Sequence, residues 1–145
     1  MNGNEPFNLE RFVTAQEDVY PDVVRELRNG RKRTHWMWYI FPQIAGLGRS
    51  PTSHFYAVKS EEEARCYLDH PVLGKRIKEC TAIVLTGDER FAEKVFGQPD
   101  TMKFHSSLTL FAYISEPGSV FDQALEKFFN GQPDPLTIAL LEKDQ

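Results

Sequence analysis

Signals for the beginnings and ends of helices recur along the whole chain, and they constrain its fold more than any other feature. Residues that typically cap helix N-termini precede apolar repeats of helical period, at Asn8, Thr34, Ser60, Ser119 and Asp134. Glycine follows most of these repeats and favours a stop, because it readily adopts the left-handed conformation. We therefore predict an all-α fold of about nine short helical pieces, too unequal in length for a regular bundle.

For three segments the prediction gives specific bounds or an alternative. The helix after Thr34 is expected to span residues 35–41, since Phe41 precedes Pro42 and the residue before a proline avoids the helical region. Residues 43–53 are predicted to be a loop, followed by a short helical turn over 54–58. A strand is the alternative to a helix over residues 107–114, which are rich in β-branched and aromatic side chains.

The length of 145 residues predicts one domain spanning residues 1–145, with residues 1–6 flexible. A net charge of −4 argues against general nucleic-acid binding. No apolar run is long enough to span a membrane, and the polar N-terminus does not resemble a signal peptide. Cys66 and Cys80 are interpreted as small buried hydrophobes, which is typical of a cytoplasmic protein.

A basic segment stands out against this acidic background. Five cations and one anion lie between residues 25 and 33, directly before the predicted helix start at Thr34. Helix N-termini offer free N–H groups and the positive end of the helix dipole. We therefore predict that Arg33, Thr34 and His35 bind an anionic group such as a phosphate. The alternative is a basic turn that is merely solvated.

Both tryptophans of the chain follow at once, within His35-Trp36-Met37-Trp38-Tyr39-Ile40-Phe41. A short helix that is apolar on all sides is expected to be buried, so most of this block is interpreted as core. The alternative for Trp36 and Trp38 is that one of them stacks on a ring of a ligand.

A third cluster, residues 100–107, combines an acid, two bases and two serines. Asp100 and His105 are the candidates for acid–base catalysis, and Lys103 is a candidate ligand-binding cation. As helix neighbours, Asp100 and Lys103 could instead simply pair. The spacing of His105 and Ser107 is too common to identify a nucleophile and its base.

Motifs for cofactors and metals are absent from the sequence. It contains no phosphate-binding GxxxxGK, no GxGxxG after a strand and no CxxC. The four histidines lack the spacings of metal ligands. We expect neither a cofactor nor a metal site.

The residues just described resemble the domain of unknown function 1810 family, from about residue 7 to residue 141. The resemblance rests on His35-Trp36-Met37-Trp38, Phe41-Pro42-Gln43, Tyr67-Leu68, His70-Pro71, Leu73-Gly74, Phe96-Gly97, Asp100, Lys103 and residues 106–111. It implies a small, largely helical bacterial protein, sometimes labelled calpastatin-like, and no established activity.

The sequence is therefore consistent with three functions. The first is binding of an anionic, nucleotide-like or sugar-phosphate-like ligand near the tryptophans. The second is a non-catalytic protein-interaction module whose basic turn docks a partner. A weaker resemblance to the YbiA-like proteins implies the third, an N-glycosidase of ADP-ribose-like compounds, although their catalytic motif has no residue-by-residue counterpart here.

Overall fold

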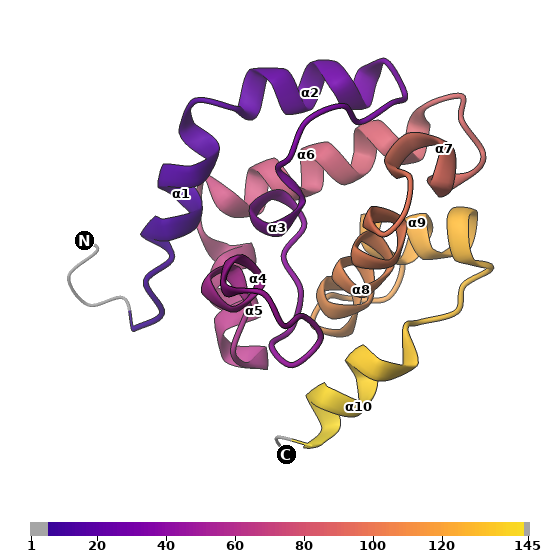
Figure 1. The fold of residues 1–145 in the computed structure, drawn as a ribbon. Helices are drawn as coiled ribbons and strands as arrows, with labels where there is room; N and C mark the ends of the chain where they lie inside the picture. The colour runs from indigo at the N-terminus through magenta and orange to yellow at the C-terminus, as the bar shows by residue number, and fades with distance from the viewer. Residues whose placement is uncertain (1–5, 144–145) are drawn as a thin grey trace.

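The computed structural model describes residues 6–143, and within this range the chain forms ten helices and no strand (Figure 1). The all-α prediction is thereby confirmed. The segment expected to be flexible, 1–6, lies outside the described residues except for Pro6. The helices are α1 (Glu10–Glu17), α2 (Tyr20–Arg28), α3 (Met37–Ile40), α4 (Pro51–Tyr56), α5 (Glu61–Asp69), α6 (Leu73–Thr86), α7 (Ala92–Phe96), α8 (Asp100–Tyr113), α9 (Val120–Phe129) and α10 (Pro135–Lys143).

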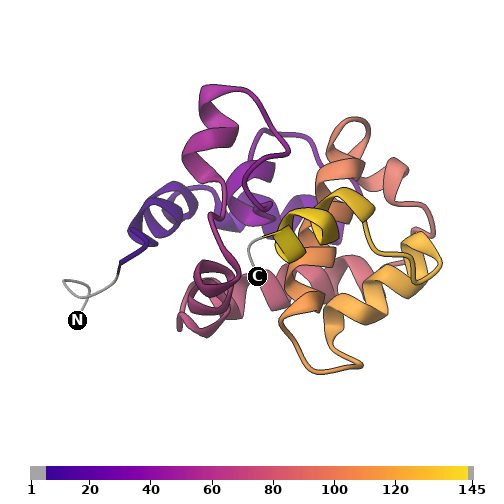
Figure 2. The ribbon, with the colours of Figure 1, turned by 90° about the horizontal axis from the view of Figure 1, so that it is seen from below.

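The two longest helices, α6 and α8, organise the packing. Helix α9 packs against both of them, while α2 and α5 pack against α6. The short helix α3 lies at the centre of the view in Figure 1 and contacts α1, α4 and α8. Helix α10 packs against α8 at the lower edge of the molecule in Figure 1, and it faces the viewer in Figure 2, which is seen from below. None of the helices in residues 6–143 is long and apolar enough to cross a membrane.

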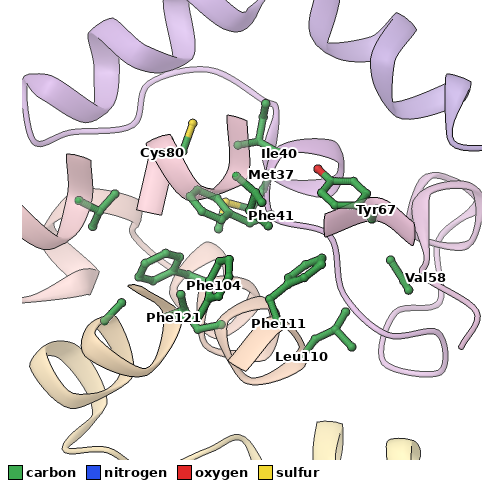
Figure 3. Packing of buried hydrophobic residues seen from close by; sticks show 14 of the residues in the cluster. Met37, Ile40, Phe41, Val58, Tyr67, Cys80, Phe104, Leu110, Phe111 and Phe121 are labelled. Carbon is green, nitrogen blue, oxygen red and sulfur yellow. The ribbon is translucent and has the colours of Figure 1, made fainter. Parts of the chain in front are cut away.

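Aromatic rings from the α3 segment and from α8 meet in the core, which also contains aliphatic side chains from most of the other helices. Met37 and Phe41 face Phe104 and Phe111 (Figure 3), and the rings of Phe41 and Phe104 lie edge to face with centroids 5.1 Å apart. Such pairs contribute about 1 kcal/mol each beyond the area they bury. The interpretation of the aromatic block as core is confirmed for most of its residues, and Trp36 is only 1% exposed.

The caps were predicted with mixed success. Ser60, Ser119 and Asp134 accept hydrogen bonds from their helices, as expected. Asn8 is not a cap, because it adopts a left-handed φ of 53° and α1 begins after Leu9. The helix predicted over 35–41 is confined to α3, and its N-cap is Trp36 rather than Thr34.

The helix predicted through residues 107–114 is confirmed up to Tyr113, and the alternative of a strand is excluded, because α8 buries most of these side chains on a helix face. One further prediction was wrong about where a helix lies. The helical turn predicted over 54–58 begins earlier, at Pro51, where Ser50 caps α4. The remainder of that segment pairs with the preceding loop through an isolated parallel bridge between Ile44 and Val58.

A buried ion pair that sequence patterns did not reveal ties α1 to α4 and α5. Arg11 Nη2 lies 2.8 Å from Glu63 Oε2, and both side chains are nearly inaccessible. The same guanidinium donates to the carbonyl oxygens of Phe55 and Ala57, at the end of α4. Because a buried charge requires such partners, this contact fixes α4 against the body of the protein.

The junction of α5 and α6 depends on Gly74. An added Cβ at this position would lie 1.9 Å from the carbonyl oxygen of Leu68, a backbone atom that cannot move aside cheaply. We predict that Gly74→Ala lowers the free energy of unfolding by about 3 kcal/mol, whereas Lys75→Ala, on the exposed side of α6, changes it by less than about 0.5 kcal/mol. Urea denaturation of the two variants tests this, and equal stabilities would contradict the close approach.

Candidate functional site

Two adjoining cavities lie beside α3, and four residues line both of them: Trp38, Gln43, Gly48 and Ser53. The smaller cavity has a volume of about 250 Å³ and the larger one of about 410 Å³. Ile44, Ala45, Gly46, His54, Tyr56, Ala57 and Lys59 complete the smaller cavity. Leu47, Arg49, Ser50, Pro99, Met102, Lys103, His105, Ser106, Asp134 and Leu136 complete the larger one.

Trp38 and Lys103 are brought together at the larger cavity, as their shared candidate role requires. Lys103 Nζ lies 4.4 Å from the centre of the Trp38 indole, a cation–π contact. The same ammonium lies 3.5 Å from Asp100 Oδ1, one helical turn earlier on α8. Lys103 is therefore held between an aromatic face and a carboxylate at the cavity wall.

Asp100 is engaged on both of its oxygens. Its Oδ2 lies 2.8 Å from Lys32 Nζ, and the Lys32 side chain is only 7% exposed. Lys32 also lies over the ring of Trp36, with Nζ 5.1 Å from its centre. Asp100 therefore holds the ammonium groups of Lys32 and Lys103 in position. Asp100 itself lines neither of the two cavities.

His105 lines the larger cavity in a fixed orientation. Its ring stacks on Phe129 with centroids 4.0 Å apart and an angle of 8° between the planes. Its Nε2 lies 2.7 Å from the carbonyl oxygen of Gln132. Because a carbonyl oxygen can only accept, Nε2 donates a proton in this contact, which leaves Nδ1 as the second ring nitrogen.

Asp134 also lines the larger cavity, and it is both an N-cap and a wall residue. Its Oδ2 accepts from the hydroxyls of Thr137 and Ser106, at 2.6 and 3.1 Å. Its backbone N–H donates to Thr109 on α8. These bonds attach the start of α10 to α8 and fix one side of the cavity.

Arg33, Thr34 and His35 lie elsewhere, on exposed backbone before α3, and line neither cavity. The N–H groups of Arg33 and Thr34 already have an acceptor, because they donate to Glu26 Oε1 at 2.7 and 3.0 Å. The Thr34 hydroxyl donates to Glu26 Oε2, and Trp36 Nε1 donates to Oε1. The anion at this turn is thus a side chain of α2, and the exposed Arg33 and His35 side chains remain candidates for a ligand.

Burial alone would raise the pKa of Glu26, but its hydrogen bonds from Arg33, Thr34 and Trp36 together lower the pKa below its ordinary value. The folded state therefore favours the ionised carboxylate. Its contribution to stability is complete above the pKa of the unfolded chain and is lost as pH falls through the lowered pKa of the folded protein.

Of the residues that line the larger cavity, the sequence indicated Trp38, Lys103 and His105 as site candidates. It did not indicate Gln43, Arg49 or Asp134. Gln43 belongs to the Phe41-Pro42-Gln43 motif, which was a usable signal, and Arg49 follows the glycines of the loop. No spacing rule connects Glu26 with residues 33–36, because that contact exists only after α2 folds back on the turn. Among residues 6–143, no three His, Cys, Asp or Glu side chains are grouped so that they could hold a metal ion.

We predict that Glu26→Ala destabilises the protein by about 3 kcal/mol, because four donors lose their shared acceptor. Glu26→Gln should cost only about 1 kcal/mol, since its carbonyl can accept from the N–H groups and its amide can donate to Thr34. The difference between wild type and Glu26→Gln should shrink from about pH 7 to about pH 3. Denaturant titrations across this range measure it, and a difference independent of pH would contradict the role of the charge.

Comparisons with known proteins agree with this fold and leave the chemistry open. The structure is similar to that of the conserved hypothetical protein Rv1873 from Mycobacterium tuberculosis, with 49% sequence identity and a TM-score of 0.93. The match covers 95% of this chain and 99% of that one. A search of curated proteins gave no match. The family model described as "Protein of unknown function (DUF1810)" matches residues 6–141, nearly the whole length, and the chain therefore belongs to that family.

Proposed function

We propose that the protein binds a small anionic ligand in the larger cavity, with Trp38 against a ring of the ligand and Lys103 facing its anionic group. The observation that supports this most strongly is the contact of Lys103 with Trp38 at the cavity wall. A half-buried ammonium beside an indole offers charge and a flat apolar face to the same ligand. Concave sites with a few convergent polar groups are the usual form of small-ligand sites.

Arg49 adds a second cation to the larger cavity, and Asp134 is its one acid. The Asp134 carboxylate accepts two hydroxyl hydrogen bonds on Oδ2, which reduces its repulsion of a bound anion. His105 supplies the proton acceptor through Nδ1 if the ligand undergoes a reaction. In this proposal Asp100 acts indirectly, because it holds Lys103 at the cavity wall.

The exposed Arg33 and His35 side chains form a separate candidate position for an anion. They lie on the same turn as Thr34, whose N–H and hydroxyl groups are directed to Glu26. A ligand here would therefore contact side chains only. Because a single exposed cation binds an anion weakly in water, the cavity is the stronger candidate.

We predict that Lys103→Ala weakens binding of ribose 5-phosphate about tenfold, because one hydrogen-bonded charge is lost. Titration followed by tryptophan fluorescence tests this. Trp36 is buried against Glu26, whereas Trp38 lines the cavities, so a change in fluorescence on binding should disappear in Trp38→Phe.

Lys78→Ala, which removes an exposed lysine of α6, is the matched control and should leave binding unchanged. Loss of binding in Arg33→Ala but not in Lys103→Ala would place the anion at the basic turn instead of the cavity. If neither phosphate nor ribose 5-phosphate binds wild type, the small-ligand proposal is wrong and a protein-interaction module becomes the better reading.

A further inference from the structure

The smaller cavity differs chemically from the larger one, although the two adjoin. Lys59 is its one lysine or arginine, it has no acidic lining residue, and Ile44, Ala45, Tyr56 and Ala57 are among its uncharged lining residues. The larger cavity is lined by Arg49, Lys103 and Asp134. A ligand that extended through both would therefore place its charged group in the larger cavity and an uncharged part in the smaller one.

Gln43 lies where the two cavities meet, and its carboxamide is available for hydrogen bonds. Gln43 lines both cavities, and its carboxamide makes no hydrogen bond within the described residues 6–143. A primary amide offers two donor hydrogens and an acceptor oxygen in one plane. It can therefore recognise a partner that also presents a donor and an acceptor side by side.

The backbone holds Gln43 in place. Its carbonyl oxygen accepts from the N–H of Val58 at 2.9 Å, and the N–H of Ala45 donates to the carbonyl oxygen of Val58 at 2.8 Å. Ile44, between them, is 3% exposed, and Val58 is fully buried. The start of the Gln43 side chain is thus fixed before any ligand arrives, which reduces the entropy lost on binding.

The walls of the smaller cavity suit a flat group. Trp38 lines it, and so does Tyr56, whose ring packs against Tyr39 with centroids 5.3 Å apart. Both side chains are large and have few rotatable bonds. Gly48 approaches Ser53 so closely that an added Cβ would lie 2.5 Å from the serine Oγ, which keeps this shared wall compact.

We infer, building on the proposed function, that the smaller cavity is a subsite for the base of a nucleoside phosphate. The base would lie against Trp38 with its hydrogen-bonding edge on the Gln43 carboxamide, and the phosphate would face Lys103 and Arg49. A carboxamide pairing with the donor–acceptor edge of a base, as glutamine does with adenine, is a common mode of recognition. A sugar phosphate alone would leave both the amide and the smaller cavity unused.

Isothermal titration calorimetry with adenosine, guanosine, cytidine and uridine 5′-monophosphates, ribose 5-phosphate and the four nucleosides tests this inference. At least one monophosphate should bind wild type about tenfold tighter than ribose 5-phosphate. Gln43→Ala should remove that advantage, because it weakens monophosphate binding more than ribose 5-phosphate binding. Lys103→Ala should weaken both ligands. Gln123→Ala, which truncates an exposed glutamine of α9, is the matched control.

The outcomes separate this inference from the proposed function. If every monophosphate binds no tighter than ribose 5-phosphate, or if Gln43→Ala preserves the difference, the base subsite is wrong while the anion site stands. If no anion binds but a nucleoside binds in a Gln43-dependent way, the anion site is wrong and the subsite for the base survives in modified form. If nothing binds, both proposals are overturned.

Discussion

The buried carboxylate of Glu26 determines the course of the chain between α2 and α3, and the candidate site depends on that course. Four hydrogen bonds bring residues 33–36 back onto α2. Because Trp36 is one of the four donors, its indole is directed into the protein. Trp38, two residues later, is left half-buried beside the cavities. The Glu26 carboxylate therefore occupies the N–H donors that a bound anion would have needed. It also places Trp36 in the core while Trp38 remains beside the cavities.

Much of the fold was predictable because its signals are local. A serine before an apolar repeat or a glycine after it acts within one helical turn, and Ser60, Ser119 and Gly30 behave accordingly. The failures occurred where tertiary contacts decide. Thr34 has the chemistry of a cap, but its hydroxyl and N–H bind Glu26 instead of a helix end. Over residues 107–113 the local side chains also favour a strand, and the helix that was predicted there forms as part of α8.

The candidate site was predictable only in part, for a related reason. Trp38, Lys103 and His105 attract attention because large or ionisable side chains are conspicuous in a sequence. Their proximity depends on α3 packing against α8, which no local pattern encodes. Gln43 and Arg49 are ordinary residues of a loop until the cavities show what surrounds them. Conversely, Asp100 was a candidate catalytic acid. Its pairing with Lys103 was the alternative that the sequence offered, whereas its contact with Lys32 became evident only in three dimensions.

The loop before α4 is joined to the segment after α4 by the isolated bridge between Ile44 and Val58. Residues 43–50, which contribute to the cavity walls, are joined to Val58 through two backbone hydrogen bonds, and Ser50 accepts a third from the N–H of His54 in α4. Backbone bonds do not depend on side-chain identity, so Ala45 and Arg49 can change without loss of this attachment. Gly46, with a φ of 108°, Gly48 and the α4 cap Ser50 are more constrained. Ligand preference could therefore diverge within the family through this short loop while the aromatic core stays the same. In the proposed function, selectivity would thus be set by loop residues outside the aromatic core.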